Sequence, residues 1–459
     1  MARTPEQNNA IITGSIPRQL LLFFFPIWLG TMFQQLYNTV DTLIVGNFVG
    51  TQALAAVGAT SSFVQLLVGL FVGLCSGAGV IIAQSFGAGD YDEVNRQMHT
   101  ALALAIAGGA ALTVIGLLIS RPVLRLMQTP DEIVGMASEY LQIYFLGMIP
   151  QMIYNMGTNI LRAVGDSKRP LYFLIVASIV NIVLDIVLVA VIPLGVAGAA
   201  IATVASQVVS AVLTVRCIHG SQGMPWHLQL QNIRIERSVL LAICRIGLPG
   251  AAQSALYSIS NMTIQSAING FGTVAVAAWS VYGKIDFLFW MTVSSFGIAV
   301  TTFAGQNFGA RQYERVRRGT MTCLAMTAGA TLCISLALYP SAQLLFRLFS
   351  SDDAVVAQGV QMMHYLVPVY MTYICIEIFS GALRGCGDVR VPTIITVFAV
   401  CIMRIVWLAV ALPFKHELSV VEFSYPLTWI TATVLFAIYY AKGGWMQRCI
   451  AAQNAKTQG

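Results

Sequence analysis

The sequence predicts an all-α membrane protein with twelve transmembrane helices in two pseudosymmetric six-helix lobes. Of its 459 residues, 57% are hydrophobic and only 10% are charged, whereas a soluble domain carries about 25% charged residues. Apolar runs long enough to cross a bilayer as helices follow one another along the chain. Short motifs also recur at one constant spacing, and this repeat divides the chain into two related halves.

The predicted helices are apolar runs of about twenty residues or more, the length that a helix needs to cross the hydrocarbon core. They lie near 17–47, 53–84, 96–119, 132–162, 171–192, 196–217, 239–269, 275–306, 318–340, 355–384, 393–413 and 419–441. Pro26 in the first run and Pro249 in the seventh are expected to bend their helices, because proline lacks the N–H that a helix interior uses. The first run has no small-residue cleavage site, so we expect it to be a span and not a signal peptide.

Three motif pairs at an offset of 222 residues establish the repeat. AQSFGAGDYDEV at 83–94 returns as GQNFGARQYERV at 305–316, and LRAVGDSKRP at 161–170 returns as LRGCGDVRVP at 383–392. The third pair is Asn47, Gly50 and Thr51 with Asn269, Gly272 and Thr273. We therefore predict an N-terminal lobe over 1–217, a polar linker over 218–238 and a C-terminal lobe over 239–459. Six helices is an even number, so the two repeats are parallel.

The basic residues are distributed unevenly between the two sides of the predicted membrane. Nineteen of the 25 Lys and Arg residues fall in the tails and in the loops on the side of the termini, and four fall on the opposite side. Because positive loops remain in the cytoplasm, both termini are predicted to be cytoplasmic in a multi-pass protein of the plasma (inner) membrane. The net charge of +6 therefore reflects membrane orientation, and no nucleic-acid partner is expected.

The fifth apolar run contains a carboxylate, which is costly in the hydrocarbon core and usually marks an ion or substrate site. Ser178, Asn181 and Asp185 share one helix face by their spacing. At a rise of about 1.5 Å per residue, Asp185, Asp41 in the first run and Thr203 in the sixth all lie about 10 Å from the outer end of their helices. These hard oxygen ligands are typical of a site for a proton or a small hard cation such as Na⁺. The alternative is an Asp–Asn hydrogen bond that only fixes helix packing.

The second lobe cannot build the same site, because the repeat mates of these residues differ. The mates of Asp41, Asn181, Asp185 and Thr203 are Thr263, Met403, Trp407 and Tyr425. Its own intramembrane charges are Lys284, Asp286, Glu377 and Arg404, and the repeat mate of Glu377 is Asn155. Buried charges are normally paired, and the pair that we predict is Glu377 with Arg404. A role in structural locking and a role in substrate contact both remain open for these residues.

Two groups of motifs resemble those of the multidrug and toxic compound extrusion (MATE) family. They are GALRGCGD at 381–388 with the related LRAVGD at 161–166, and the AQxFGA-type turns. The resemblance covers essentially the whole chain. The first-lobe pattern of Asp41, Asn181 and Asp185 is similar to that of the DinF-like branch. The resemblance implies export of organic, often cationic, compounds against inward Na⁺ or H⁺ by alternating access. It also implies that Thr203 joins these three residues in binding the coupling ion and that Pro26 is the bending point of the first helix.

The chain departs from the NorM-like branch, which has an acid in the seventh helix where this chain has Tyr257. The helix-ten aspartate of that branch falls near Tyr373, whereas the acid here is Glu377. The first lobe is therefore expected to hold the coupling ion. Six residues remain as candidates for a substrate cavity or a second-lobe polar network, namely Asn155, Tyr257, Lys284, Asp286, Glu377 and Arg404.

Antiport has two alternatives. The wider superfamily contains flippases for lipid-linked precursors, which remain the alternative within transport. An intramembrane enzyme is disfavoured because no HExxH or GxSxG motif occurs, and the five histidines lie in loops or near helix ends. The expected partners are the lipid bilayer and small drug-like molecules, the expected state is a monomer, and no cofactor is expected beyond the coupling ion.

Overall fold

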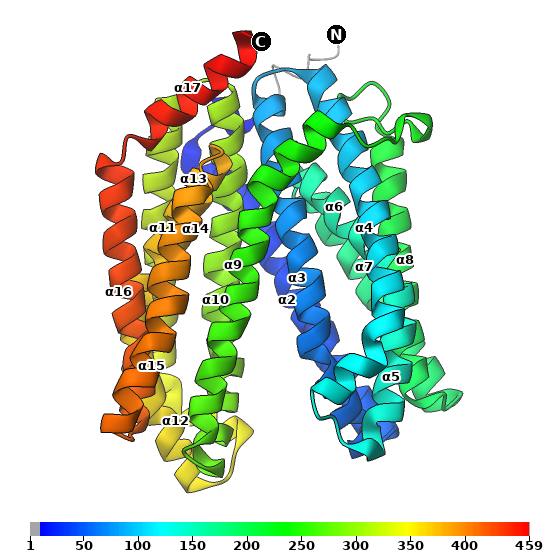
Figure 1. Cartoon of the computed structure of the whole chain (residues 1–459), viewed down its shortest axis with the longest axis vertical. Coiled ribbons are helices and arrows are strands. Elements are labelled where there is room, and N and C mark those ends of the chain that lie inside the picture. Colours follow the sequence, from blue (N-terminus) through cyan, green and yellow to red (C-terminus); the bar gives the residue numbers. More distant parts are fainter. Residues whose placement is uncertain (1–9, 459) are drawn as a thin grey trace. The chain divides into compact units, whose positions relative to one another are not determined.

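The computed structural model describes residues 10–458, and across these residues the chain forms helices and no strand (Figure 1). The long uninterrupted helices are α2 (Ile16–Phe48), α3 (Thr51–Gly87), α4 (Tyr91–Leu126), α8 (Gly195–His219), α9 (Arg237–Asn269), α10 (Thr273–Gly309), α11 (Tyr313–Phe349) and α16 (Leu418–Lys442). Short helices are α1 (Ala10–Thr13), the 3₁₀ turn η3 (Leu230–Asn232) and the C-terminal α17 (Trp445–Gln458).

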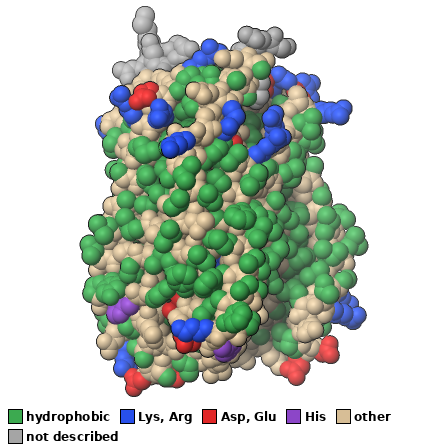
Figure 2. Space-filling view, turned by 60° about the vertical axis from the view of Figure 1, so that its left-hand side comes forward, with side chains coloured by type: hydrophobic (Ala, Val, Ile, Leu, Met, Phe, Trp, Pro, Cys, Tyr) green, Lys and Arg blue, Asp and Glu red, His purple; other side chains and the backbone are tan. Residues whose placement is uncertain are grey.

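Eleven of the described helical segments are long and apolar enough to cross a membrane. Three of them contain an irregular turn. In one, α7 (Lys168–Asp185) continues into the π-helix η2 (Ile186–Val191), which ends the span. In another, the π-helix η5 (Val397–Ile402) lies between α14 (Arg390–Thr396) and α15 (Met403–Phe414). In the third, a 3₁₀ turn lies between two helices, as α12 (Asp353–Leu366), η4 (Val367–Val369) and α13 (Tyr370–Gly385). On the face shown in Figure 2, hydrophobic side chains cover the middle and charged side chains gather towards the ends.

The predicted span 132–162 is two helices in the structure and not one. α5 (Asp131–Leu146) and α6 (Met148–Ala163) meet at Gly147, whose N–H bonds to the carbonyl of Tyr144 at 3.0 Å in a tight turn. A Cβ atom on Gly147 would lie 2.2 Å from Oε1 of Gln207 on α8. A side chain at position 147 would therefore displace the end of the Gln207 side chain. Pro150 in the first turn of α6 suits a helix start because the first N–H groups have no helical partner.

The chain divides into two compact units whose borders lie inside helices. The first unit is Phe25–Ala251, and the second is Ala10–Phe24 with the chain from Ala252 onward. The borders fall beside Pro26 in α2 and beside Pro249 in α9. The compact units therefore do not coincide with the sequence repeats. α2 begins in the second unit and continues in the first, whereas α9 begins in the first unit and continues in the second.

The start of α2 is anchored within the second unit by aromatic and polar contacts. The rings of Phe24 and Phe296 stack with centroids 4.0 Å apart. Arg315 on α11 donates hydrogen bonds to the carbonyl oxygens of Ile11, at 3.0 Å, and of Gly14. Charge-assisted bonds of this kind are stronger than neutral ones. They tie the N-terminal segment to α11.

The start of α9 packs against α3 within the first unit, and glycines allow the two backbones to touch. A Cβ atom on Gly77 would lie 2.6 Å from the carbonyl oxygen of Ile243 and 2.7 Å from the nitrogen of Gly247. A Cβ atom on Gly73, one turn away, would lie 2.6 Å from the nitrogen of Ala251. Gly73 and Gly77 form a small-xxx-small pair, the pattern that permits close helix approach inside membranes.

The segment between the repeats folds back onto the N-terminal end of α4. Arg96 binds Glu236 at 2.6 Å, and Glu236 also binds Arg234 at 2.9 Å. His99 is buried and its Nε2 accepts a hydrogen bond from the backbone N–H of Gln229 at 3.1 Å. The residues of the predicted linker are therefore held against α4 by this polar clamp of Arg96, His99, Arg234 and Glu236.

We predict that Glu236→Gln loosens this clamp. Hydrogen bonds from Arg96 and Arg234 lower the pKa of Glu236 below its ordinary value, so the clamp is complete above a pH of about 4.3 and weakens as the pH falls through the lowered pKa. An exposed ion pair contributes about 0.2–1 kcal/mol. Hydrogen exchange of residues 220–236 should therefore accelerate up to about fivefold. The matched control is Glu314→Gln, which removes only the exposed pair with Arg318, and equal exchange in both variants would contradict the clamp.

The C-terminal helix α17 occupies the corresponding place in the second unit. The offset of 222 residues aligns 223–236 of the linker with 445–458 of α17. Gln453 accepts a hydrogen bond from Tyr313 at 3.1 Å and donates to the carbonyl of Phe308 at 3.4 Å. In the first unit, Trp226 lies against Phe86, the repeat mate of Phe308, with ring centroids 5.7 Å apart. Each repeat therefore ends in a segment that packs against its own Phe-Gly-Ala turn.

Candidate functional site

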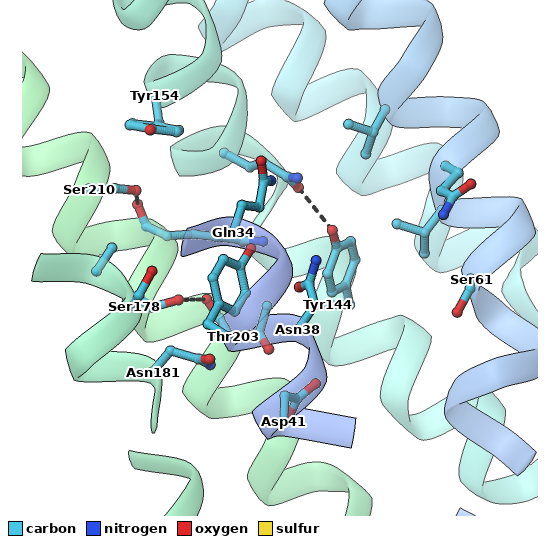
Figure 3. A pocket seen from close by; sticks show the side chains of 18 of the residues that line it. Gln34, Asn38, Asp41, Ser61, Tyr144, Tyr154, Ser178, Asn181, Thr203 and Ser210 are labelled. Carbon is cyan, nitrogen blue, oxygen red and sulfur yellow. Dashed lines mark hydrogen bonds between the residues drawn. The ribbon is translucent and has the colours of Figure 1, made fainter. Parts of the chain in front are cut away.

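A polar cavity of about 740 Å³ lies inside the first unit. Six helices line it, namely α2, α3, α5, α6, α7 and α8. Figure 3 shows side chains from these helices pointing into one space, with Asp41, Asn38 and Gln34 on one helix and Ser178 and Asn181 on another. The lining is mainly of amides, hydroxyls and phenols, together with Asp41. A space of this size, within the usual range of about 300–1,000 Å³ for ligand pockets, can hold a small organic molecule.

Asp41 and Asp185 approach each other at this cavity. Asp41 on α2 lines the cavity, and Asp185 is fully buried at the end of α7. Their carboxyl groups lie within hydrogen-bonding reach of each other. Two ionised carboxylates have only acceptor atoms, so this contact requires a shared proton or a cation between them.

The atoms of the pair that could bind such an ion are buried and have no donor from the described residues. They are Oδ1 of Asp41 and both carboxyl oxygens of Asp185. In Asn181 the amide oxygen likewise lacks a donor, and the amide nitrogen lacks an acceptor, among the described residues. A buried polar atom without a partner costs about 1–3 kcal/mol, and a charged one costs more. Carboxylate and amide oxygens are the ligands that hard cations prefer. The donor set therefore suits a proton or Na⁺.

Asn181 and Thr203 lie on the walls of the same cavity. Asn181 is 1% exposed and sits one turn before Asp185 on α7. The hydroxyl of Thr203 on α8 donates to the carbonyl of Ala199 at 3.0 Å, so its oxygen remains able to accept or to bind a cation. The structure thus places Asp41, Asn181 and Thr203 on the walls of one cavity. Asp185 is buried behind this lining, and its carboxyl group contacts that of Asp41.

The backbone changes at the position of Asp185. The α-helical pattern of α7 ends at this residue, and the π-helix η2 begins at Ile186. A π turn shifts the rotation of the residues that follow it, and such turns are frequent at functional sites. In the second repeat the π-helix η5 ends at Ile402, five residues before Trp407, the mate of Asp185. The two repeats therefore differ in backbone as well as in side chains here.

Several cavity residues were missed by reasoning from the sequence. Gln34 and Asn38 precede Asp41 on α2 at helical spacing and line the cavity with it. That spacing is the signal that could have identified them. Tyr140 on α5 lies close enough to interact electrostatically with both carboxyl groups of the Asp pair. No pattern in the sequence indicated Tyr140, because its position depends on how α5 packs.

The predicted ion pair between Glu377 and Arg404 is not formed. Arg404 donates to the hydroxyl of Thr428 at 3.3 Å, and its guanidinium lies 4.5 Å from the ring centroid of Tyr425. Glu377 instead contacts Tyr373, which also contacts Tyr257. The prediction failed because α16 supplies a hydroxyl and a ring to Arg404, which helix spacing alone could not show.

The remaining candidates, Asp286, Lys284 and Asn155, have different surroundings in the structure. Asp286 on α10 is buried and accepts a hydrogen bond from Nε1 of Trp290 at 2.5 Å. Lys284 is exposed, with its amine 5.5 Å from the ring centroid of Phe349. Asn155 lines the first-unit cavity, so the repeat mate of Glu377 belongs to the polar cavity and not to a second-unit network.

One family model and several known proteins are similar to most of this chain. The MatE family model matches residues 26–187 and 249–410. The probable multidrug resistance protein YoeA of Bacillus subtilis (strain 168) is 28% identical over 436 residues, covering 93% of this chain and 94% of that protein. A FAD transporter of Shewanella oneidensis is 24% identical over 360 residues, covering 76% and 78%.

Among solved structures, an outward-facing multidrug resistance MATE family transporter of the MOP superfamily aligns with a TM-score of 0.89 at 22% identity. The alignment covers 99% of this chain and 100% of that one. A MOP superfamily transporter from Pyrococcus furiosus aligns with a TM-score of 0.88 at 23% identity, covering 97% and 98%. The predicted fold class of twelve transmembrane helices in two six-helix lobes is confirmed by this likeness.

Proposed function

Since the chain belongs to the MATE family of multi-pass membrane transporters, we propose that it exports drug-like organic compounds in exchange for Na⁺ or H⁺. Its relatives include proteins named multidrug resistance proteins. The proposed membrane is the plasma membrane with both termini in the cytoplasm, which the distribution of basic residues supports. Pro26 at the border of the units is the proposed bending point of α2.

The observation that carries the proposal is the Asp41–Asp185 pair at a ligand-sized cavity. With an ion bound, the charge of the pair is partly cancelled. Without it, the pair is an uncompensated negative site that attracts an organic cation into the same space. Ion and substrate then stabilise different states of one site, which is the condition for thermodynamic coupling. Asn181 and Thr203 complete the proposed oxygen ligands for Na⁺.

The polarity of the cavity favours cationic substrates over lipid-linked precursors or FAD. Its described lining includes the carboxylate of Asp41 and contains no Lys, Arg or His. A pyrophosphate group normally requires such cationic partners. The flippase function and the transport of a flavin dinucleotide, the substrate in the name of one relative, are therefore the weaker candidates.

The test is transport of ethidium in proteoliposomes with ΔpH and ΔNa⁺ imposed separately. We expect one of the two gradients to drive uphill ethidium movement and the other to have no effect of its own. Addition of FAD or of a lipid-linked pyrophosphate should not compete with ethidium. The proposal would be overturned if neither gradient drove uphill movement of ethidium, or if the lipid-linked pyrophosphate competed with ethidium.

A further inference from the structure

A second pocket, of about 430 Å³, lies at the end of the first unit where the linker packs. Arg169 in the first turn of α7 and Arg216 in the last turn of α8 form two of its walls. Cys217 of α8 and residues that follow the helix close it, the latter being Gly220, Ser221, Gln222, Met224 and Trp226. This pocket is separate from the polar cavity, because the two share no lining residue.

The pocket carries more positive than negative charge. Arg169 binds Asp166 at 3.2 Å and donates to Sγ of Cys217 at 3.4 Å, while half of its side chain stays exposed. Arg216 is exposed and forms no ion pair with any described residue. One carboxylate therefore faces two guanidinium groups, and a planar guanidinium suits the oxygens of a phosphate.

The equivalent place in the second unit is neutralised by the protein itself. Asp388, the mate of Asp166, accepts a hydrogen bond from Tyr439 at 2.5 Å, and Arg448 of α17 donates to the Tyr439 hydroxyl at 2.7 Å. The mate of Arg216 is Ile438. The second repeat thus has one acid and one base, and the first repeat has an additional arginine. Among the residues compared, the additional guanidinium group belongs to the first repeat.

Exposed apolar side chains lead away from both arginines along the two helices. On α7, Tyr172 and Val176 follow Arg169 by three and seven residues and are 57% and 43% exposed. On α8, Val212 and Val208 precede Arg216 by four and eight residues and are 49% and 43% exposed. These spacings place each stripe below its arginine on one helix face. α7 and α8 also pack against each other, and Arg169 contacts Cys217 beside Arg216, so each stripe begins at the pocket and continues into the span on its own helix.

We propose that this pocket binds the phosphate of an anionic phospholipid through Arg169 and Arg216, with the acyl chains along the two apolar stripes. Basic pockets between transmembrane helices are suited to anionic headgroups. A soluble phosphate ion uses only the guanidinium groups, whereas a phospholipid uses the stripes as well. The apolar stripes are therefore the reason to assign a lipid and not a free anion.

The test is native mass spectrometry of the purified full-length protein titrated with dioleoyl phosphatidylglycerol or dioleoyl phosphatidylcholine. Wild type should retain phosphatidylglycerol preferentially, and R169Q/R216Q should bind it about 30-fold more weakly, since two basic contacts are lost. The control R317Q/R318Q removes the same charge from exposed positions on α11 and should bind as wild type. R216Q alone keeps the Arg169–Asp166 pair and should lose about fivefold if the double variant does not fold.

Two further arms separate the sources of the phosphate. Inorganic phosphate and the short-chain dihexanoyl phosphatidylglycerol should fail to displace the long-chain lipid at equal concentration. Displacement by inorganic phosphate would show a free-anion site and overturn the lipid assignment. Equal loss of binding in R169Q/R216Q and R317Q/R318Q, or no lipid preference in wild type, would overturn the site itself.

Discussion

Asp185→Asn should abolish ion-driven efflux while the protein still folds and inserts. The carboxamide has nearly the shape of the carboxyl group, but it neither binds a proton nor carries a charge for Na⁺. The carboxamide nitrogen can donate a hydrogen bond to the carboxylate of Asp41. The substitution therefore removes the repulsion between two carboxylates that can only accept hydrogen bonds. We expect the melting temperature to be unchanged or raised, and gradient-driven accumulation of ethidium to fall by about 100-fold, in the upper range of coupling free energies.

The informative control is Asp286→Asn, which changes another buried intramembrane aspartate. Its Oδ atom can still accept the hydrogen bond from Trp290, and this residue lies in the second unit. Efflux should persist in Asp286→Asn and be lost in Asp41→Asn as in Asp185→Asn. Full coupled transport in both first-unit variants, measured at equal expression, would disprove the assignment of the ion site.

Gly77→Ala is expected to destabilise the protein even though alanine is the better helix former. The new methyl group would lie 2.6–2.9 Å from backbone atoms of Ile243 and Gly247, and backbone atoms cannot move aside as a flexible side chain can. α3 and α9 must therefore separate. Overpacking of this kind costs about 1–3 kcal/mol, so we expect a melting temperature lower by several degrees in detergent.

Gly58→Ala on the same helix provides the matched control. No atom lies within 4 Å of the position that its Cβ would take. The substitution should therefore show only the gain in helix propensity, about 0.5–1 kcal/mol. Opposite shifts in melting temperature for the two variants would support close packing of α3 with α9, whereas equal shifts would count against it.

Much of the fold and part of the site could be predicted from the sequence. The repeat was visible because similar turn motifs recur at one offset. In the structure the matched glycines of one motif, Gly165 and Gly387, both have positive φ angles, 94° and 89°, after α6 and α13. The span 132–162 was predicted as one helix because hydropathy does not register a break within an apolar run. Its break at Gly147 is a tight turn in which the N–H of Gly147 bonds to the carbonyl of Tyr144, and the side chain of Gln207 from α8 lies against that glycine.

The sequence by itself predicted which segments cross the membrane, that they form two repeats, and that Asp41, Asp185 and Thr203 lie at a similar depth, with Asn181 one turn deeper. These properties follow from chain-local quantities, the apolar length of a run and the fixed rise of a helix. Only the tertiary structure decided that the carboxyl groups of Asp41 and Asp185 meet and that Arg404 turns to Tyr425 and Thr428 instead of Glu377. The physical reason is that helix spacing specifies a face, whereas the rotation and packing of several helices decide what that face contacts.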